Sequence, residues 1–428
     1  MKKKGNIVNS FIVIFLSLTQ LSCSPIRNNE RITIASSGKI DSLDPAQAST
    51  LRSLQLISAL GDPLYRLTSD GKLMPKIARS LPIISNNGMI IDIPLREGIF
   101  FHDGTLFNAE AMEFSLNRFI RIGTQNYILG DRIKSIEVQN EFLLRINLNR
   151  PSSSITGLLT SLNLTPVSPT AYNKHKDKFL NNNFIGTGPY KLISFTPEKQ
   201  RLTPFELYWD KKPENKGIDY INLSNSTSLF GAMRSGEVDI LLSNSIEDGQ
   251  RLALHKMTQN GIIREGNGPS MEVGYITFNS NSKPFNNSKI REALSYSLNR
   301  KLISQKVSFG TREPLRSIVP PILKDNNNNP WPKYNPKITR TLLKSENYCT
   351  TKKLIIPLTF RSNVPADKLL AMTWQEQVKR DLSDCLEIKL NGVESTTIYK
   401  QLSEGVYQAV ILDWTGAYPD PEAYLSPL

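Results

Sequence analysis

The chain has 428 residues, a formal net charge of +13 and three cysteines. This length predicts about two or three domains with an ample hydrophobic core. Because Lys and Arg residues are scattered along the chain, the charge indicates a basic, solvated surface and argues against nucleic acid as a partner.

The first residues have the pattern of an export signal. Lys2, Lys3 and Lys4 precede an apolar stretch at 7–18 that is too short to span a bilayer, and Ser22 then precedes Cys23. We expect residues 1–22 to be removed. The pattern resembles the lipobox of bacterial lipoproteins, in which the cysteine is acylated, although Gln20 stands where that box usually has an aliphatic residue. The alternative is an ordinary signal peptide with an incidental cysteine.

After this leader the sequence alternates predicted strands, turns and helices. We expect a strand at 31–36, short strands and turns from 55 to 118, and a helix that begins at Asn108. Two more strands follow at 136–148, and a helix at 154–162. The motif GTGPY at 186–190 lacks the lysine of a phosphate loop, and Pro189 has no N–H to offer an anion, so we interpret it as a turn at a domain crossing.

The second half shows the same mixture. Strands are predicted at 217–223 and 274–279, and a helix follows Asn287 with one apolar face: Ile290, Ala293, Leu294, Leu298 and Leu302. A strand at 354–360, a helix through Trp374 and Val378 and a strand at 386–390 predict a parallel crossover. This order of elements indicates an α/β protein.

The parallel crossover brings two cysteines together. Cys349 and Cys385 each lie just before one of the two strands, and parallel strands begin at the same edge of a sheet. In an oxidising compartment they can form a disulfide. The alternative is two unrelated thiols.

The last predicted strand leads into a candidate binding loop. Residues 409–412 form a continuous apolar run, typical of a strand buried on both faces, and residues 413–421 leave its carboxyl end. Ligands of open α/β sheets bind at such ends.

Sequence signals for catalysis or a metal site are weak. There is no G-x-S-x-G or H-E-x-x-H motif, and His102, His175 and His255 share no ligand spacing. Asp420 and Glu422 lie in a Pro-rich loop, where acids usually form turns. We therefore expect no catalytic residue, no cofactor and no metal.

Several stretches together resemble the extracellular solute-binding proteins of peptide-type ABC transporters, the family of oligopeptide, dipeptide and nickel binders. Each stretch is short, but their order and spacing extend over nearly the whole chain after the leader. They are SLDP at 42–45, GKLMPKIA at 71–78, LREGIFFHDGT at 95–105, GTGPY at 186–190, YW at 208–209, SGEVDI at 235–240, IREAL at 290–294 and WTGAYPDP at 414–421.

The resemblance implies a two-lobed, type II periplasmic-binding-protein-like fold with an extra inserted region. Lobe I would comprise residues 23–55 and 185–270, the inserted region 56–184, and lobe II 271–428. Family members continue well past the motif at 414–421, so we expect the C-terminal part of lobe II to be missing.

The resemblance also implies where ligand binds. In peptide binders the loop matching 414–421 carries an aromatic residue and, three residues later, an aspartate that pairs with the ligand's α-amino group. Here that position is Ala417. A ligand amine would therefore lack a charge-assisted hydrogen bond that contributes roughly 1.5 to 3 kcal/mol to the binding free energy. The candidate ligand-binding residues of this loop are Trp414, Gly416, Ala417, Tyr418 and Asp420.

Each candidate has a structural alternative. Trp414 and Tyr418 offer flat surfaces for stacking on ligand, or they pack between the lobes. The carboxylate of Asp420 pairs with the ligand's amino group in place of the aspartate that is missing at Ala417, or it shapes the turn between its two neighbouring prolines. Arg361, just after the strand at 354–360, receives a ligand carboxylate or is a surface arginine.

The resemblance implies a lipid-anchored, extracytoplasmic receptor that captures a short peptide or peptide-like solute and delivers it to a membrane permease. Two alternatives remain open. The same fold can bind a non-peptide solute such as a nickel chelate, an opine or an oligosaccharide, or the chain is an inactive truncated remnant.

Overall fold

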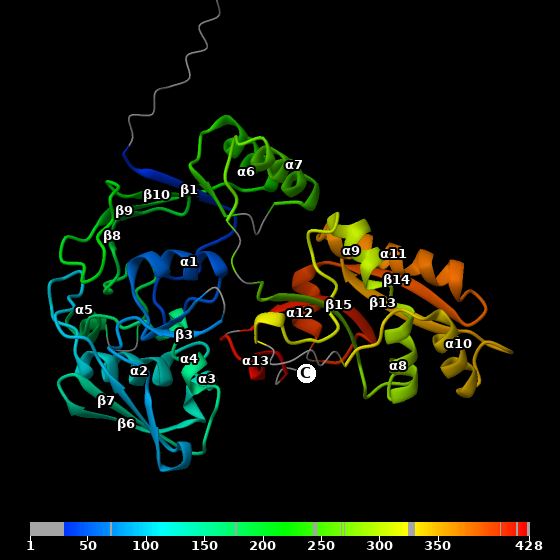
Figure 1. Ribbon diagram of the computed structural model, residues 1–428, viewed down its shortest axis with the longest axis horizontal. Coiled ribbons are helices and arrows are strands. Elements are labelled where there is room, and N and C mark those ends of the chain that lie inside the picture. Colours follow the sequence, from blue (N-terminus) through cyan, green and yellow to red (C-terminus); the bar gives the residue numbers. More distant parts are fainter. Residues whose placement is uncertain are drawn as a thin grey trace, which may run out of the picture.

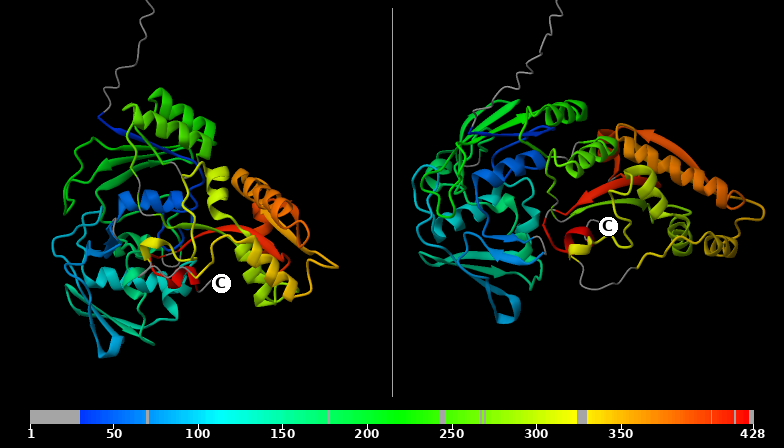
Figure 2. Two further views of the ribbon diagram at one scale, coloured as in Figure 1. Left: turned by 45° about the vertical axis from the view of Figure 1, so that its right-hand side comes forward. Right: turned by 45° about the horizontal axis from the view of Figure 1, so that its top comes forward.

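The structure is a computed structural model that describes residues 30–68, 71–175, 178–242, 246–266, 268, 270–323, 330–402, 404–416 and 418–425. The elements gather into two halves (Figure 1), and the division persists in the views of Figure 2. One half holds β1–β11 with α1–α7, and the other holds β12–β15 with α8–α12. Among the described helices, none combines the length and apolarity that a membrane span requires.

The first sheet has the strand order β11-β1-β10-β9-β8. Strand β1 pairs in parallel with β10 and β11, whereas β10, β9 and β8 are antiparallel. The strands are β1 Ile32–Ser36, β8 Tyr190–Phe195, β9 Lys199–Pro204, β10 Ile218–Asn222 and β11 Ile240–Leu241; the helices nearby are α1 Leu51–Leu60, α6 Ser226–Ser235 and α7 Asp248–Gln259. Apolar side chains of α1 and of this sheet share one core cluster.

An antiparallel sheet of order β4-β5-β7-β6 and a hairpin of β2 and β3 form the second unit. The strands are β2 Tyr65–Leu67, β3 Leu73–Pro75, β4 Ile83–Ser85, β5 Ile90–Pro94, β6 Ile133–Asn140 and β7 Leu143–Leu148. The α-helices are α2 Ala109–Ile122, α3 Tyr127–Gly130, α4 Ile155–Leu158 and α5 Pro169–Tyr172. Helix α2 begins at Asn108, whose side chain accepts from the N–H of Ala111, because an asparagine at this position satisfies a free backbone donor.

The third sheet has the order β12-β15-β13-β14. Strands β13 and β14 pair in parallel from Leu354↔Leu386 onward, which confirms the predicted crossover through α11. The strands are β12 Glu272–Phe278, β13 Leu354–Arg361, β14 Leu386–Val393 and β15 Ala409–Thr415. The helices are α8 Ser288–Ser297, α9 Arg300–Ser308, α10 Pro336–Ser345, α11 Pro365–Asp381, α12 Ser395–Leu402 and α13 Glu422–Leu425; short 3-10 turns occur at Asn86–Gly88, Leu162–Leu164, Asn173–His175 and Pro321–Leu323.

Strand β15 is covered on both faces, as its apolar run predicts. Ala409 and Ile411 belong to the core cluster shared with α8, α10 and α11, whereas Val410 and Leu412 belong to a cluster with Ile398 of α12. The strand continues to Thr415, so Trp414 belongs to the sheet. The predicted loop therefore begins later than expected.

The cysteines meet at the beginning of the crossover. The sulfur atoms of Cys349 and Cys385 lie 2.10 Å apart. Cys385 is fully buried, and the N–H of Leu354 donates to its carbonyl oxygen at 2.8 Å.

Three helices differ from the sequence-based expectation. The helix predicted at 154–162 is limited to α4, Ile155–Leu158. Helix α1 extends over residues 55–60, for which short strands and turns were predicted. The predicted single helix after Asn287 is divided into α8 and α9. The division occurs because the side chain of Asn299 accepts from the N–H of Leu302 and thereby starts a second helix.

Each sheet draws its strands from one set of the expected segments. We therefore propose the division into lobe I (23–55 and 185–270), inserted region (56–184) and lobe II (271–428).

Candidate functional site

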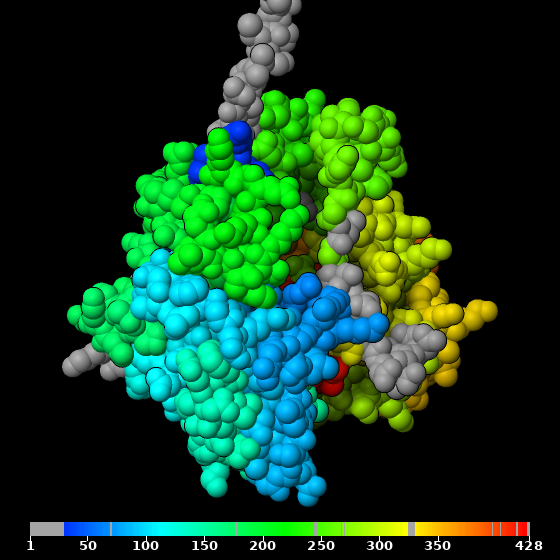
Figure 3. Space-filling view, turned by 60° about the vertical axis from the view of Figure 1, so that its left-hand side comes forward, coloured from blue at the N-terminus to red at the C-terminus, as the bar shows by residue number. Residues whose placement is uncertain are grey.

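A pocket of about 500 Å³ lies where the three regions meet. It is lined by Pro189 and Tyr208 of lobe I, Asp62 and Thr160 of the inserted region, and Met271 and Pro419 of lobe II. In Figure 3 red atoms of the C-terminal segment are visible beside the blue residues of the inserted region. The pocket thus involves residues from both halves of the molecule.

Close backbone packing shapes one wall of this pocket. The N–H of Gly188 donates to the carbonyl oxygen of Leu60 at 3.0 Å. A Cβ atom at Gly188 would lie 2.4 Å from the backbone nitrogen of Gly61, so only glycine permits this approach. The GTGPY motif therefore serves to hold the end of α1 against the start of β8. Pro189, the next residue, lines the pocket.

A second motif supports the same wall. His102 of LREGIFFHDGT is buried, and its backbone N–H donates to Gly186 at 2.9 Å. Its ring Nε2 lies 3.1 Å from the carbonyl oxygen of Gly188 and therefore donates to it. Burial lowers the pKa of His102 to about 4. The neutral imidazole is thus a structural hydrogen-bond donor rather than a ligand or base.

An acid and a base from the pocket wall pair with each other. Lys76 Nζ lies 3.5 Å from Asp62 Oδ1 and donates to the hydroxyl of Tyr208 at 3.0 Å. The indole N–H of Trp209 donates to Asp62 Oδ2 at 2.9 Å. Burial raises the pKa of the Asp62 carboxyl group, and the ammonium of Lys76 offsets part of this effect. The wall therefore holds a fixed, hydrogen-bonded charge pair.

Asp62, Lys76 and Met271 were not among the predicted site residues. Lys76 and Tyr208 lie inside motifs that carry the family resemblance, and those motifs were the only available signal. Asp62 has no local signal, because its link to Lys76 depends on the β2–β3 hairpin.

The predicted loop reaches the pocket through Pro419, a residue that was not singled out. Tyr418 is 7% exposed and packs in the core cluster of the inserted region. The Asp420 carboxylate accepts from the N–H of Glu422, the first residue of the short helix α13, at 2.9 Å. Gly416 lies against Tyr424, where a Cβ atom would be 2.7 Å from the ring. These three residues make structural contacts.

Trp414 is the most accessible of the predicted aromatics. Its side chain is 36% exposed, and its indole N–H donates to the carbonyl oxygen of Ala423 at 2.8 Å. It is not part of the pocket lining. Ala417 and Cys23 lie outside the described residues.

Arg361, for which the sequence left a ligand carboxylate or a surface position open, is the last residue of β13 and is paired with acids of its own lobe. It is 6% exposed, and its guanidinium donates to both oxygens of Asp367 at 2.6 and 3.0 Å and to both oxygens of Asp413 at 3.0 and 2.7 Å. It also reaches the hydroxyl of Tyr399 at 2.9 Å. Burial lowers the pKa of Arg361, but the hydrogen bonds to Asp367 and Asp413 raise it by more, so the pKa lies above its ordinary value. The guanidinium is therefore fully used within lobe II.

Across the part of the chain that the structure describes, no three His, Cys, Asp or Glu side chains come together as a metal site.

Known proteins share this fold. NikA from Brucella suis, solved in complex with Fe(III)-EDTA, aligns with a TM-score of 0.81 at 21% identity over 92% of this chain and 81% of that chain. A dipeptide binding protein from Pseudoalteromonas sp. SM9913, in complex with Met-Leu, gives 0.74 at 21% identity, over 92% and 82%. These alignments confirm the predicted two-lobed, type II α/β fold.

Sequence comparison adds a curated relative and a family. The glutathione-binding protein GsiB of Salmonella typhi is 28% identical over 335 residues, which are 77% of this chain and 64% of that protein. The matched part of this chain thus spans less than two thirds of that relative's length. Residues 72–428 match the model "Bacterial extracellular solute-binding proteins, family 5 Middle". Because this match covers well over half of its length, the chain belongs to family 5 of the bacterial extracellular solute-binding proteins.

Proposed function

We propose that this protein is the binding component of an ABC importer, which captures a short peptide or peptide-like solute and delivers it to a membrane permease. The pocket of about 500 Å³ at the junction of the three regions carries the proposal. Its volume falls in the range of about 300 to 1,000 Å³ typical of small-molecule sites. The relatives point to the same class, since one is named for glutathione and another was solved with Met-Leu.

The proposed mechanism is capture by closure, without chemistry. A solute in the pocket touches Asp62 and Thr160 on one side and Met271 and Pro419 on the other. Such a solute binds best when both halves are close together, so it shifts an open-to-closed equilibrium toward the closed state. The permease then receives the closed, loaded form.

Calorimetry with the mature chain tests the proposal. The ligand panel comprises dipeptides, tripeptides and glutathione, with an Fe(III) chelate and an opine as non-peptide arms. Replacing Met271 by Trp fills the pocket, and we expect at least about a tenfold loss of peptide affinity. The matched control is Met372→Trp on α11, whose side chain is 41% exposed and outside the pocket.

The outcomes separate the alternatives. Binding of peptides by the wild type and the control, but not by Met271→Trp, supports the proposal. If only the chelate or the opine binds, the ligand of this pocket belongs to that solute class and is not a peptide. Peptide binding that survives Met271→Trp contradicts the assignment of this pocket.

We also propose that a lipid on Cys23 tethers the protein to the membrane. The pattern of residues 2–23 supports this, with cleavage between Ser22 and Cys23. We expect the wild type to associate with the membrane and to incorporate labelled fatty acid. The Cys23→Ser variant should do neither. Release of the unlabelled wild type after ordinary cleavage would contradict the anchor.

A further inference from the structure

We propose that the pocket selects solutes that carry a carboxylate, and that the guanidinium of Arg66 receives this group. The inference rests on the proposed function and narrows the chemical class of its solute. It follows from which of the charged side chains around the pocket are already engaged.

Among the residues that the structure describes, three charged side chains line the pocket: Asp62, Arg66 and Lys76. Asp62 accepts from the indole of Trp209 and pairs with Lys76. Lys76 also donates to the carboxylate of Asp210 at 3.3 Å. Because Lys76 lies between two carboxylates, its charge is already compensated and it offers little to an incoming anion.

Arg66 is in a different position. Among the described residues, its side chain has neither an ion-pair partner nor a hydrogen bond, and it is exposed. A guanidinium has five N–H donors in a planar fork that fits the two oxygens of a carboxylate. Arg66 is therefore the lining cation whose donors are available to a ligand.

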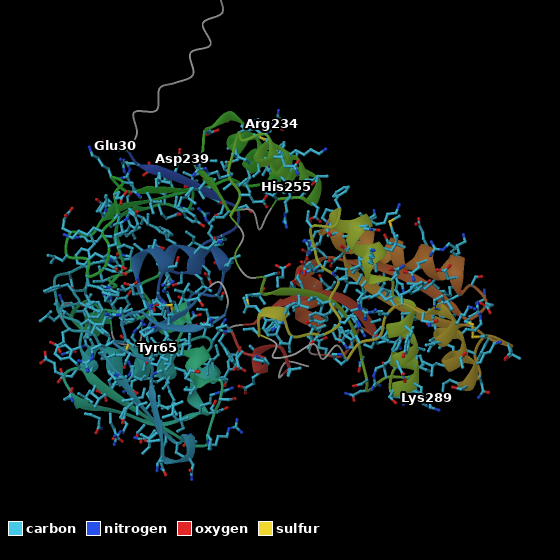
Figure 4. The ribbon with its side chains drawn as sticks, in the orientation of Figure 1. Glu30, Tyr65, Arg234, Asp239, His255 and Lys289 are labelled. Atoms are coloured by element: carbon cyan, nitrogen blue, oxygen red, sulfur yellow. A yellow bond between two sulfur atoms is a disulfide. The ribbon has the colours of Figure 1, made fainter. Side chains whose placement is uncertain are left out.

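The hairpin directs Arg66 away from the core. Tyr65, its neighbour on β2, is fully buried in the core of the inserted region, where Figure 4 places it. Successive side chains of a strand point to opposite faces, so Arg66 must leave the core on the pocket side. The pairing of Arg66 with Met74 on β3 fixes this register.

The rest of the lining strengthens an ion pair at Arg66. Pro63, Leu67, Leu162 and Met271 contribute apolar surface to the pocket. Closure of the two halves over a solute would remove water from an ion pair at Arg66, so the attraction would be stronger there than at the exposed surface where Arg66 lies in this structure. The predicted ligand has an apolar part against these walls and an acid group at Arg66.

Three tripeptides distinguish where the carboxylate comes from. Ala-Gln-Ala amide has none, Ala-Gln-Ala has a terminal carboxylate, and Ala-Glu-Ala amide has a side-chain carboxylate. We expect the wild type to bind at least one of the two acids about tenfold or more tighter than the neutral amide, as for a charge-assisted bidentate pair.

Variants of Arg66 test the role of the guanidinium. Arg66→Gln should remove the preference for acids and leave affinity for the neutral amide within about threefold, and Arg66→Lys should restore part of the preference. The matched control is Arg79→Gln, an exposed arginine outside this pocket's lining, which should keep the wild-type preference. Melting curves of each variant verify that the fold is retained.

Two results would overturn the inference. Equal affinity of the wild type for all three tripeptides, or an unchanged preference in Arg66→Gln, refutes the role of Arg66 and leaves the proposed function intact. Failure of the wild type to bind any peptide removes the peptide assignment, and the inference falls with it.

Discussion

Asp44 and Arg118 form a buried ion pair that joins the turn after β1 to helix α2. The guanidinium donates to the two carboxylate oxygens at 2.8 and 2.6 Å, and the side chains are 0% and 2% exposed. Asp44 also accepts from the N–H of Leu180 at 3.0 Å. The SLDP motif therefore serves to lock lobe I to the inserted region.

Removing one partner of this pair should destabilise the protein strongly. In Arg118→Met the buried Asp44 carboxylate loses its counter-ion, which costs about 3 to 5 kcal/mol. The matched control is Arg145→Gln, which breaks a pair with Asp92 whose arginine is 32% exposed, and should destabilise the protein far less because water screens an exposed pair. Urea unfolding measures both. Similar losses in the two variants would show that burial of the Asp44 pair adds nothing.

The approach of Gly188 to Leu60 and Gly61 predicts a glycine-specific effect. Gly188→Ala places a Cβ atom 2.4 Å from backbone atoms, and the displacement this requires should cost about 1 to 3 kcal/mol and weaken solute binding. Gly231→Ala on α6, where no atom lies within 4 Å, is the control and should be neutral or stabilising. Thermal unfolding and calorimetry provide the readouts. Wild-type behaviour of Gly188→Ala would contradict this account of the GTGPY motif.

Local signals predicted the frame of the fold well. The crossover β13–α11–β14 was predicted from two apolar runs, which form the strands, and from apolar residues four positions apart, such as Trp374 and Val378, which form one face of the helix. These signals lie within each segment and do not depend on contacts with distant residues. Helix α1 was missed because Arg52 and Ser53 are buried and interrupt its apolar pattern. Their burial is possible because distant groups satisfy them, as when Arg52 donates to Gly38 and Gln200.

The site was harder to predict for the same reason. Arg361 looked available in the sequence, but the folded chain supplies Asp413, fifty-two positions away, as a second carboxylate. The pocket depends likewise on contacts between Asp62, Lys76 and Trp209, which are separated in sequence and meet through tertiary packing. Sequence motifs thus marked the segments around the site without indicating which side chain binds.

The pairing of Cys349 with Cys385 should contribute to stability. A cross-link over a sequence separation of 36 stabilises by about 4 kcal/mol on the chain-entropy model. We expect a reductant to lower the free energy of unfolding by about this amount, and to have no effect on a Cys349→Ser, Cys385→Ser double variant. Mass spectrometry of the unreduced protein should detect no free thiol at either position, and two labelled thiols would disprove the bond.

His102 predicts a pH dependence of stability with a defined sign. Burial lowers its pKa to about 4 in the folded protein, whereas an unfolded histidine has a pKa near 6.5. Between these values the unfolded chain binds the additional proton, so the stability present above about pH 6.5 is lost as the pH falls toward 4, by about 3 kcal/mol in all. Carboxyl groups titrate in part of this window, so the effect is measured as the difference between wild type and His102→Gln in urea unfolding at several pH values. The wild type should lose more stability than the variant as the pH falls, and parallel curves would show that folding does not lower the pKa of His102.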